Sequence, residues 1–401
     1  MGLSPYDLRP DLAVYFPDGT DPADVSVVAA GRPLPRGASV AVLHGHAALH
    51  DKQAHALPHR HALWAVPRGP RMPRALVPNA DRLAAHTLLA PRASTDRLTG
   101  RAFSIGVRKL PAAALIRLGR PIVVAARERS PIVSALEAAV PSAAVGCYLG
   151  NASNTGRSSA QAFLDGTVCA IAKVVQEPEG RARVAREEGL LIALGAMPAI
   201  SSRVPKLVGR LTTALGEVLI TDAFSGLPAA TVVDSHVRRF LDLCWLERSY
   251  RPARDSELFC RTVYAALAAG YAAVSDRAAT FLAGEVVPTV ITHGDFVPWN
   301  LRVSDGAVKA FDWEYGCIDG LPGWDELFFR IQVGLTYRRW TRSQLASAIR
   351  RWLSKPVAPW SAIGQQGLAT LVLLDLAERY QRHAYTSYER VTLDAARDLA
   401  A

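Results

Sequence analysis

The sequence has little lysine, few cysteines and no long apolar run. Only six of its 401 residues are lysine, so arginine supplies most of the 46 basic side chains and the net charge of +10. The five cysteines are odd in number and scattered. Without C-x-x-C spacing they argue against a zinc site and favour reduced thiols. No apolar run reaches the roughly 18–20 residues of a membrane span. We therefore expect a cytoplasmic protein with no membrane span.

A basic protein can bind nucleic acid, or a nucleotide and its phosphates. The arginines are dispersed along the chain, and no RNA-binding signature accompanies them. We therefore expect no nucleic-acid partner. Six histidines fall between His44 and His61, and clustered histidines can bind a metal ion. Loops collect histidines by chance, which favours a polar loop over a metal site.

A chain of this length is too long for one ordinary core, so two or three folding units are expected. Residues 1–100 are rich in proline and glycine, which suits short strands and turns in an α/β region of unknown role. The expected strands there are Val25–Ala30, Ser39–Leu43 and His61–Val66. Helices are expected at Ile132–Val140, Arg181–Leu194, Ala229–Arg248, Asp255–Leu282, Trp324–Leu335, Thr341–Leu353 and Gly364–His383.

Two acidic turns form the most informative part of the chain. Apolar runs at Val286–Ile291 and Val308–Phe311 each lead into a polar turn, the first carrying Asp295 and Asn300 and the second Asp312. A carboxylate that orients a hydroxyl, with an amide oxygen and a second carboxylate that hold magnesium, is the set that phosphoryl transfer needs. Asp295 could instead cap a turn, but three roles at ordered spacings favour the catalytic interpretation.

Upstream, three consecutive strands are expected at Ala143–Leu149, Ala160–Leu164 and Thr167–Val175. The third contains Ala170-Ile171-Ala172-Lys173, close to the V-A-I-K pattern that directs a lysine at nucleotide phosphates. A lysine in an apolar strand needs a partner, because a buried unpaired ammonium is costly. Glu187 or Glu188 in the next helix can supply it.

The segment between the first two of these strands contains Gly150, Gly156 and Ser158. Small, turn-forming residues leave backbone N–H groups free to approach phosphate oxygens, so this loop is a candidate for binding over the phosphates of a nucleotide. It lacks the full G-x-G-x-x-G spacing of protein kinases.

The pattern H-G-D-x-x-x-x-N at His293–Asn300, followed by Asp312-Trp313-Glu314, resembles the aminoglycoside phosphotransferase and choline kinase group. The resemblance covers about residues 140–385 and differs from the kinase catalytic loop by glycine in place of arginine after the histidine. It implies a protein-kinase-like α+β fold, with a small antiparallel-sheet lobe, a mainly helical lobe and the nucleotide between them. Residues 101–222 would form the small lobe, with its core at 141–222, and residues 223–401 the large lobe.

The resemblance also implies roles for individual residues. Asp295 would be the catalytic base, Asn300 and Asp312 would hold Mg²⁺, and Lys173 would bind ATP phosphates with Glu187 as its partner. Asp222 and Ala223 would lie at the hinge, where backbone groups meet the adenine. Asp325 would steady the catalytic loop, a role compatible with that of an acid at a helix N-terminus.

The substrate is less well defined. Only a short segment separates Asp312 from Pro322-Gly323, which favours a small-molecule hydroxyl acceptor such as an aminoglycoside, sugar or amino alcohol over a protein. Glu314 could add charge near the metal or bind a substrate group. The alternative is a nucleotide-binding pseudokinase with a regulatory role. The argument against it is the retention of four residues, Lys173, Asp295, Asn300 and Asp312.

Overall fold

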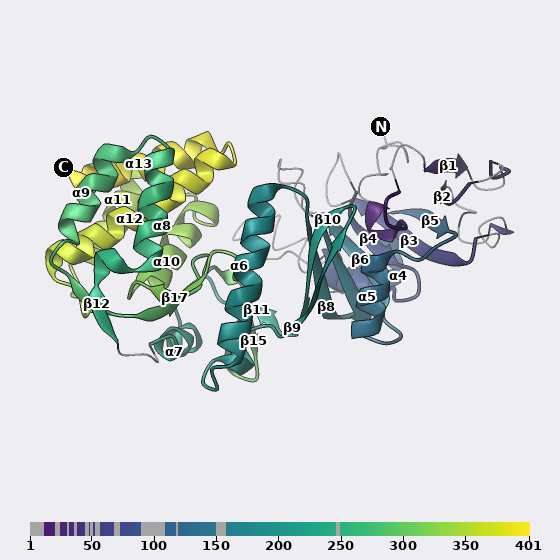
Figure 1. The fold of residues 1–401 in the computed structure, drawn as a ribbon, viewed down its shortest axis with the longest axis horizontal. Helices are drawn as coiled ribbons and strands as arrows, with labels where there is room; N and C mark the ends of the chain where they lie inside the picture. Colours follow the sequence, from purple (N-terminus) through teal and green to yellow (C-terminus); the bar gives the residue numbers. More distant parts are fainter. Residues whose placement is uncertain are drawn as a thin grey trace. The chain divides into compact units, whose positions relative to one another are not determined.

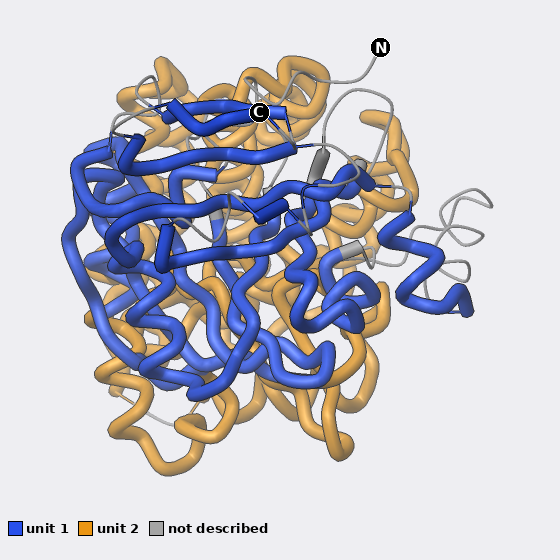
Figure 2. Tube along the Cα trace, turned by 90° about the vertical axis from the view of Figure 1, so that its right-hand side faces the viewer, with its two compact units in different colours: residues 1–92, 97–188, 205–225 blue, residues 93–96, 189–204, 226–401 orange. Residues whose placement is uncertain are grey.

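The structure is a computed structural model. It describes residues 12–20, 25–29, 32–35, 38–44, 48, 51–52, 57–67, 73–89, 109–117, 119–149, 158–245 and 249–401. The chain divides into two compact units (Figure 2). Unit 1 comprises residues 1–92, 97–188 and 205–225, and unit 2 comprises residues 93–96, 189–204 and 226–401. Helices and a large sheet are both present, which confirms the predicted α+β class.

Unit 1 is built on one ten-stranded sheet (Figure 1). Its strand order is β1-β2-β5-β3-β4-β6-β7-β8-β10-β9, and all pairs except the parallel β1–β2 pair are antiparallel. Strands from the first 100 residues pair with later ones at two places in this order: β2 and β3 flank β5, and β4 pairs with β6 through Ala75 and Leu76, which lie opposite Tyr148 and Cys147. The strands are β1 (Ser26–Ala29), β2 (Val40–His44), β3 (His59–Pro67), β4 (Pro73–Pro78), β5 (Arg120–Ala126), β6 (Ala144–Leu149), β7 (Ser158–Leu164), β8 (Thr167–Val175), β9 (Leu207–Thr213) and β10 (Gly216–Asp222).

Helix α5 (Pro131–Ala139) packs on this sheet, close to the range expected from the sequence. The Ser130 hydroxyl accepts a hydrogen bond from Val133 N at 3.3 Å, and Pro131 occupies the first helical turn. The α5 side of the sheet is apolar, and Ala172 and Val174 of β8 are buried in the same core cluster as α5. Because side chains alternate along a strand, Lys173 between them lies on the opposite face. The other helices of this unit are α2 (Ala84–Leu89), α4 (Ala112–Ile116) and the first part of α6 (Pro178–Gly195).

Unit 2 contains several helices around a core that includes the apolar side of α12. Among the described residues, no helix has both the length and the apolar character needed to cross a membrane. Short strand pairs, β15 with β16 and β14 with β17, carry the loops of the site described below. The helices are α7 (Ser235–Leu243), α8 (Glu257–Ala268), α9 (Ala272–Phe281), α10 (Trp324–Thr336), α11 (Arg342–Leu353), α12 (Ala362–Arg382) and α13 (Thr386–Ala400), and the strands are β11 (Leu227–Pro228), β12 (Tyr250–Pro252), β13 (Val286–Pro288), β14 (Val290–Thr292), β15 (Leu301–Ser304), β16 (Ala307–Ala310) and β17 (Cys317–Gly320).

Two helix predictions are wrong in extent. The helix expected at Ala229–Arg248 is shorter, because the Asp234 carboxylate accepts hydrogen bonds from the N–H groups of residues 236 and 237 and so starts α7 late. The segment Asp255–Leu282 is two helices rather than one. Gly270 has φ +84°, a left-handed conformation that ends α8 before α9 begins. Strand β9 and helix α13 were not anticipated.

Candidate active site

The two acidic turns meet at one hairpin, as the sequence predicts. Strand β14 ends at Thr292, the loop passes through a 3₁₀ turn at Pro298–Asn300, and β15 follows directly. Strands β15 and β16 are paired, with Leu301 opposite Ala310. Phe311 N then donates to Asn300 O at 3.0 Å, so that Asn300 and the residue before Asp312 lie side by side.

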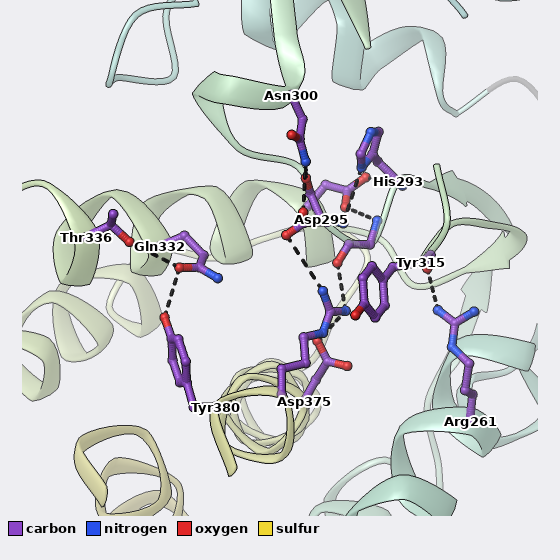
Figure 3. A network of polar contacts seen from close by, with 12 residues as sticks. Arg261, His293, Asp295, Asn300, Tyr315, Gln332, Thr336, Asp375 and Tyr380 are labelled. Atoms are coloured by element: carbon purple, nitrogen blue, oxygen red, sulfur yellow. Dashed lines mark hydrogen bonds and ion pairs between the residues drawn. The ribbon is translucent and has the colours of Figure 1, made fainter. Parts of the chain in front are cut away.

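Asp295 and Asn300 are linked directly (Figure 3). Asn300 Nδ2 donates to Asp295 Oδ2 at 2.8 Å and to the Asp295 carbonyl at 3.0 Å. Burial is the main reason that the pKa of Asp295 rises from 3.8 to about 6, and the nearby carboxylates of Asp312 and Glu314 raise it further. Arg379 and the Asn300 hydrogen bond act in the opposite direction. Asp295 is therefore mostly ionised at neutral pH and can accept a proton.

Asn300, Asp312 and Glu314 provide oxygen donors of the kind that magnesium prefers. Because Asn300 Nδ2 faces Asp295, its Oδ1 is the atom left to face a cation. Asp312 has φ +72°, an unusual conformation for a non-glycine residue, directly after the hairpin. Carboxylate oxygens of Asp312 and Glu314 lie within 4.8 Å of one another. These residues fit a magnesium ion, since two carboxylates and one amide oxygen lie at the same hairpin.

His293 connects the two turns, a role that the motif alone did not assign to it. The side chain is fully buried; its Nδ1 accepts from Asp295 N at 3.2 Å, and its Nε2 lies 3.0 Å from the carbonyl of Phe311. This pattern matches the tautomer with the proton on Nε2. The imidazole therefore ties the backbone of Asp295 to the residue before Asp312.

Gly294 cannot be replaced by a larger residue without distortion. It has φ +76°, and a Cβ atom at this position would lie 2.2 Å from the carbonyl oxygen of Tyr315. The glycine in the H-G-D pattern is therefore required by a close backbone approach.

Asp325, near the start of α10, binds the backbone of the loop that carries Asp295, as expected. Its two carboxylate oxygens accept from His293 N at 2.7 Å and Gly294 N at 2.9 Å. Burial raises the pKa of Asp325 to about 7, although these two hydrogen bonds act against the rise. Trp313 and Trp324, which lie close in sequence to these acids, are fully buried core residues.

Arg379 of α12 is the site residue that the sequence did not reveal. Its Nη2 donates to the Gly294 carbonyl at 2.9 Å, and its Nη1 lies 3.7 Å from Asp295 Oδ1. The pattern of α12 predicted an apolar face and gave no signal that an arginine near its end reaches the loop.

Unit 1 carries the predicted ion pair. Lys173 Nζ of β8 lies 2.8 Å and 2.6 Å from the two carboxylate oxygens of Glu187 in α6. Glu187 is 1% exposed, and such a buried carboxylate needs a partner. Glu188, the other candidate, binds Arg210 at 2.7 Å. The pairing of Lys173 with Glu187 is thus confirmed, and the alternative is wrong.

The other predicted nucleotide-binding residues of unit 1 are only partly described. Asp222 ends β10, its Oδ1 accepts from Lys206 N at 2.7 Å, and Ala223 N donates to Cys169 O at 3.0 Å. Gly150 and Gly156 lie outside the described residues, while Ser158 is the first residue of β7. The histidine segment also lies partly outside them. Within it, burial lowers the pKa of His61 to about 4.

The part of the chain that carries these loops resembles known phosphotransferases. Residues 132–325 match the model of the phosphotransferase enzyme family. The match includes the Lys173–Glu187 pair, both acidic turns and Asp325, and it confirms the resemblance and the kinase-like fold predicted from the motifs. No curated protein sequence matches the chain.

Several solved structures are similar in fold at low identity. A thermostable mutant of aminoglycoside phosphotransferase APH(4)-Ia, in ternary complex with AMP-PNP and hygromycin B, is 11% identical over 66% of this chain and 96% of its own, with a TM-score of 0.47. Macrolide 2'-phosphotransferase MphH from Brachybacterium faecium is 17% identical over 60% and 88%, with a TM-score of 0.36. Aminoglycoside phosphotransferase APH(3'')-Id from Streptomyces rimosus is 17% identical over 67% and 97%, with a TM-score of 0.37.

Proposed function

We propose that the protein transfers a phosphoryl group from ATP to a hydroxyl group of a small molecule, with magnesium as cofactor. The observation that carries this proposal is the grouping of three polar residues at the β15–β16 hairpin, two of them joined by a hydrogen bond. Asp295, Asn300 and Asp312 supply, in this order along the chain, the side-chain types that phosphoryl transfer requires.

In this mechanism Asp295 orients the acceptor hydroxyl and takes its proton as the phosphoryl group is transferred. Its pKa of about 6 leaves it ionised at neutral pH yet basic enough to hold the proton. Asn300 and Asp312 would hold magnesium, which, when bound, neutralises charge on the phosphates. Glu314 adds negative charge beside Asp312.

Unit 1 is proposed to bind the nucleotide. Lys173 would contact the phosphates, with Glu187 fixing the ammonium through the observed ion pair. Residues 141–222 would be the nucleotide-binding core, with backbone groups of Asp222 and Ala223 next to the adenine. Gly150, Gly156 and Ser158 would cover the phosphates, and residues 223–401 would carry the catalytic loops.

The proposal of a small-molecule acceptor rests on the segment after Asp312. This segment contains only a tight turn and strand β17 before α10 begins at Trp324. It offers no extended stretch on which a protein substrate could dock.

The test is magnesium-dependent ATP turnover by the purified protein, with Asp295→Asn measured beside wild type. The acceptors are aminoglycosides, macrolides, sugars, choline and other amino alcohols, with a protein panel as the control. Turnover that depends on one acceptor and is lost in the variant is the expected result. Tight ATP binding without turnover on any acceptor would instead favour the pseudokinase, and absence of ATP binding would refute both.

A further inference from the structure

The loop that carries Asp295 contains no lysine or arginine between Ile291 and Asn300. The position before Asp295 is closed to any side chain, because the Tyr315 carbonyl approaches Gly294 too closely. A cation beside Asp295 must therefore come from another part of the chain.

Arg379 supplies that cation from α12. Its guanidinium contacts the loop at two points, the Gly294 carbonyl at 2.9 Å and the Asp295 carboxylate at 3.7 Å. One contact fixes the backbone immediately before Asp295, and the other acts on the side chain. Together they define where the carboxylate lies relative to its own backbone.

The guanidinium is itself held in one position. Asp375, one turn earlier on α12, forms an ion pair with Arg379 Nη2 at 2.7 Å, and the Tyr315 ring lies 3.9 Å from the guanidinium carbon (Figure 3 shows Tyr315 and Asp375 beside the loop). Phe328 of α10 approaches at 5.0 Å. The Arg379 side chain is 9% exposed. A planar guanidinium with a fixed fork of donors and a stacking face fits these partners, whereas a lysine ammonium lacks both the planar fork and the stacking face.

We propose that Arg379 is a positioning residue for phosphoryl transfer, which acts by fixing the Gly294–Asp295 segment through its guanidinium. This inference rests on the proposed function, since it assigns Arg379 to the catalytic step of the same site. It places an essential residue on α12, in addition to the acidic turns.

The test compares Arg379→Met with Arg382→Met. Arg382 lies on the same helix, three residues further along, and also pairs with an acid four residues earlier, Glu378. We expect Arg379→Met to lower kcat by roughly 10- to 100-fold, because small misplacements of a catalytic group have effects of this size. The KM for ATP should change less than about twofold, and Arg382→Met should behave as wild type. Arg379→Lys should recover little activity, since it keeps the charge and loses the planar fork.

A second variant distinguishes the loss of loop positioning from the effect of leaving the Asp375 carboxylate without its ion-pair partner. Arg379→Met leaves the Asp375 carboxylate without its partner, whereas the double variant Arg379→Met/Asp375→Asn removes that unpaired charge. If Arg379 acts on the loop, kcat stays low in the double variant. Recovery of kcat there, or a kcat within twofold of wild type in Arg379→Met, would overturn the proposal.

Amide hydrogen exchange gives a readout that does not require turnover. Peptides covering residues 291–300 should exchange faster in Arg379→Met than in wild type or Arg382→Met, because the bond to the Gly294 carbonyl is lost. Unchanged exchange in this segment would refute the positioning role. If wild type shows no turnover with any acceptor while this exchange difference appears, the proposed function fails and the contact between Arg379 and the loop still holds.

Discussion

Replacing Asp295 by asparagine should stabilise the ligand-free protein while it abolishes phosphoryl transfer. Burial and the carboxylates of Asp312 and Glu314 disfavour the charged form of Asp295 and raise its pKa from 3.8 to about 6. A rise of about two units corresponds to about 3 kcal/mol of destabilisation at neutral pH. Asparagine removes the charge and keeps an oxygen that can accept from Asn300 Nδ2. We expect Asp295→Asn to raise the free energy of unfolding by roughly 1–3 kcal/mol at pH 7.5.

The stabilisation expected for Asp295→Asn depends on pH, because the pKa of Asp295 is higher in the folded than in the unfolded state. Between the unfolded-state pKa near 3.8 and the folded-state pKa near 6, the native protein binds more protons at Asp295 than the unfolded chain does. The contribution of Asp295 to stability therefore falls as the pH rises through this window. The difference in free energy of unfolding between Asp295→Asn and wild type should be close to zero near pH 4 and reach its full value above about pH 7.

Urea denaturation of wild type and Asp295→Asn at several pH values from 4 to 8, with EDTA and without nucleotide, measures this difference. Asp276→Asn, an exposed substitution on α9, is the matched control and should show no such dependence. A variant less stable than wild type at pH 7.5 would refute the reasoning. So would a difference between the two proteins that stays constant over the whole pH range.

Three further outcomes are expected. Gly294→Ala should lower the free energy of unfolding by at least about 2 kcal/mol in urea, because its Cβ meets the Tyr315 carbonyl. Gly189→Ala, on an exposed and open face of α6, should be neutral or stabilising. Asp325→Ala leaves two buried N–H groups without an acceptor, so kcat should fall about tenfold and amide exchange at residues 293–295 should accelerate. Glu187→Gln removes the charge that pairs with Lys173, so calorimetry should show about tenfold weaker ATP binding, whereas unchanged affinity would refute its role.

The parts of the site that the sequence predicted are those fixed by local spacing. Asn300 and Asp312 flank two strands joined by a tight turn, so the pairing of β15 with β16 brings them together. Lys173 and Glu187 lie on a strand and the helix that follows it. The cost of burying an unpaired charge predicted an acidic partner in that helix, and the resemblance favoured Glu187 over Glu188. The fold class was implied by the family resemblance that these motifs carry.

The parts that the sequence missed depend on contacts between distant segments or on the conformation of a single residue. The division of Asp255–Leu282 into two helices depends on the left-handed conformation of Gly270, and the apolar pattern continues past that break. The bridging role of His293 requires the Phe311 carbonyl to lie next to the ring, which the motif does not specify.

Arg379 shows this limit most clearly. Helix α12 contains two arginine–acid pairs at the same i, i+4 spacing, Arg379 with Asp375 and Arg382 with Glu378. Both would be interpreted as helix-stabilising ion pairs. The first reaches the Gly294 carbonyl, 85 residues away in sequence. Gly294 cannot carry a side chain, so the cation beside Asp295 comes from another segment, and the packing of α12 against the loop makes Arg379 that cation.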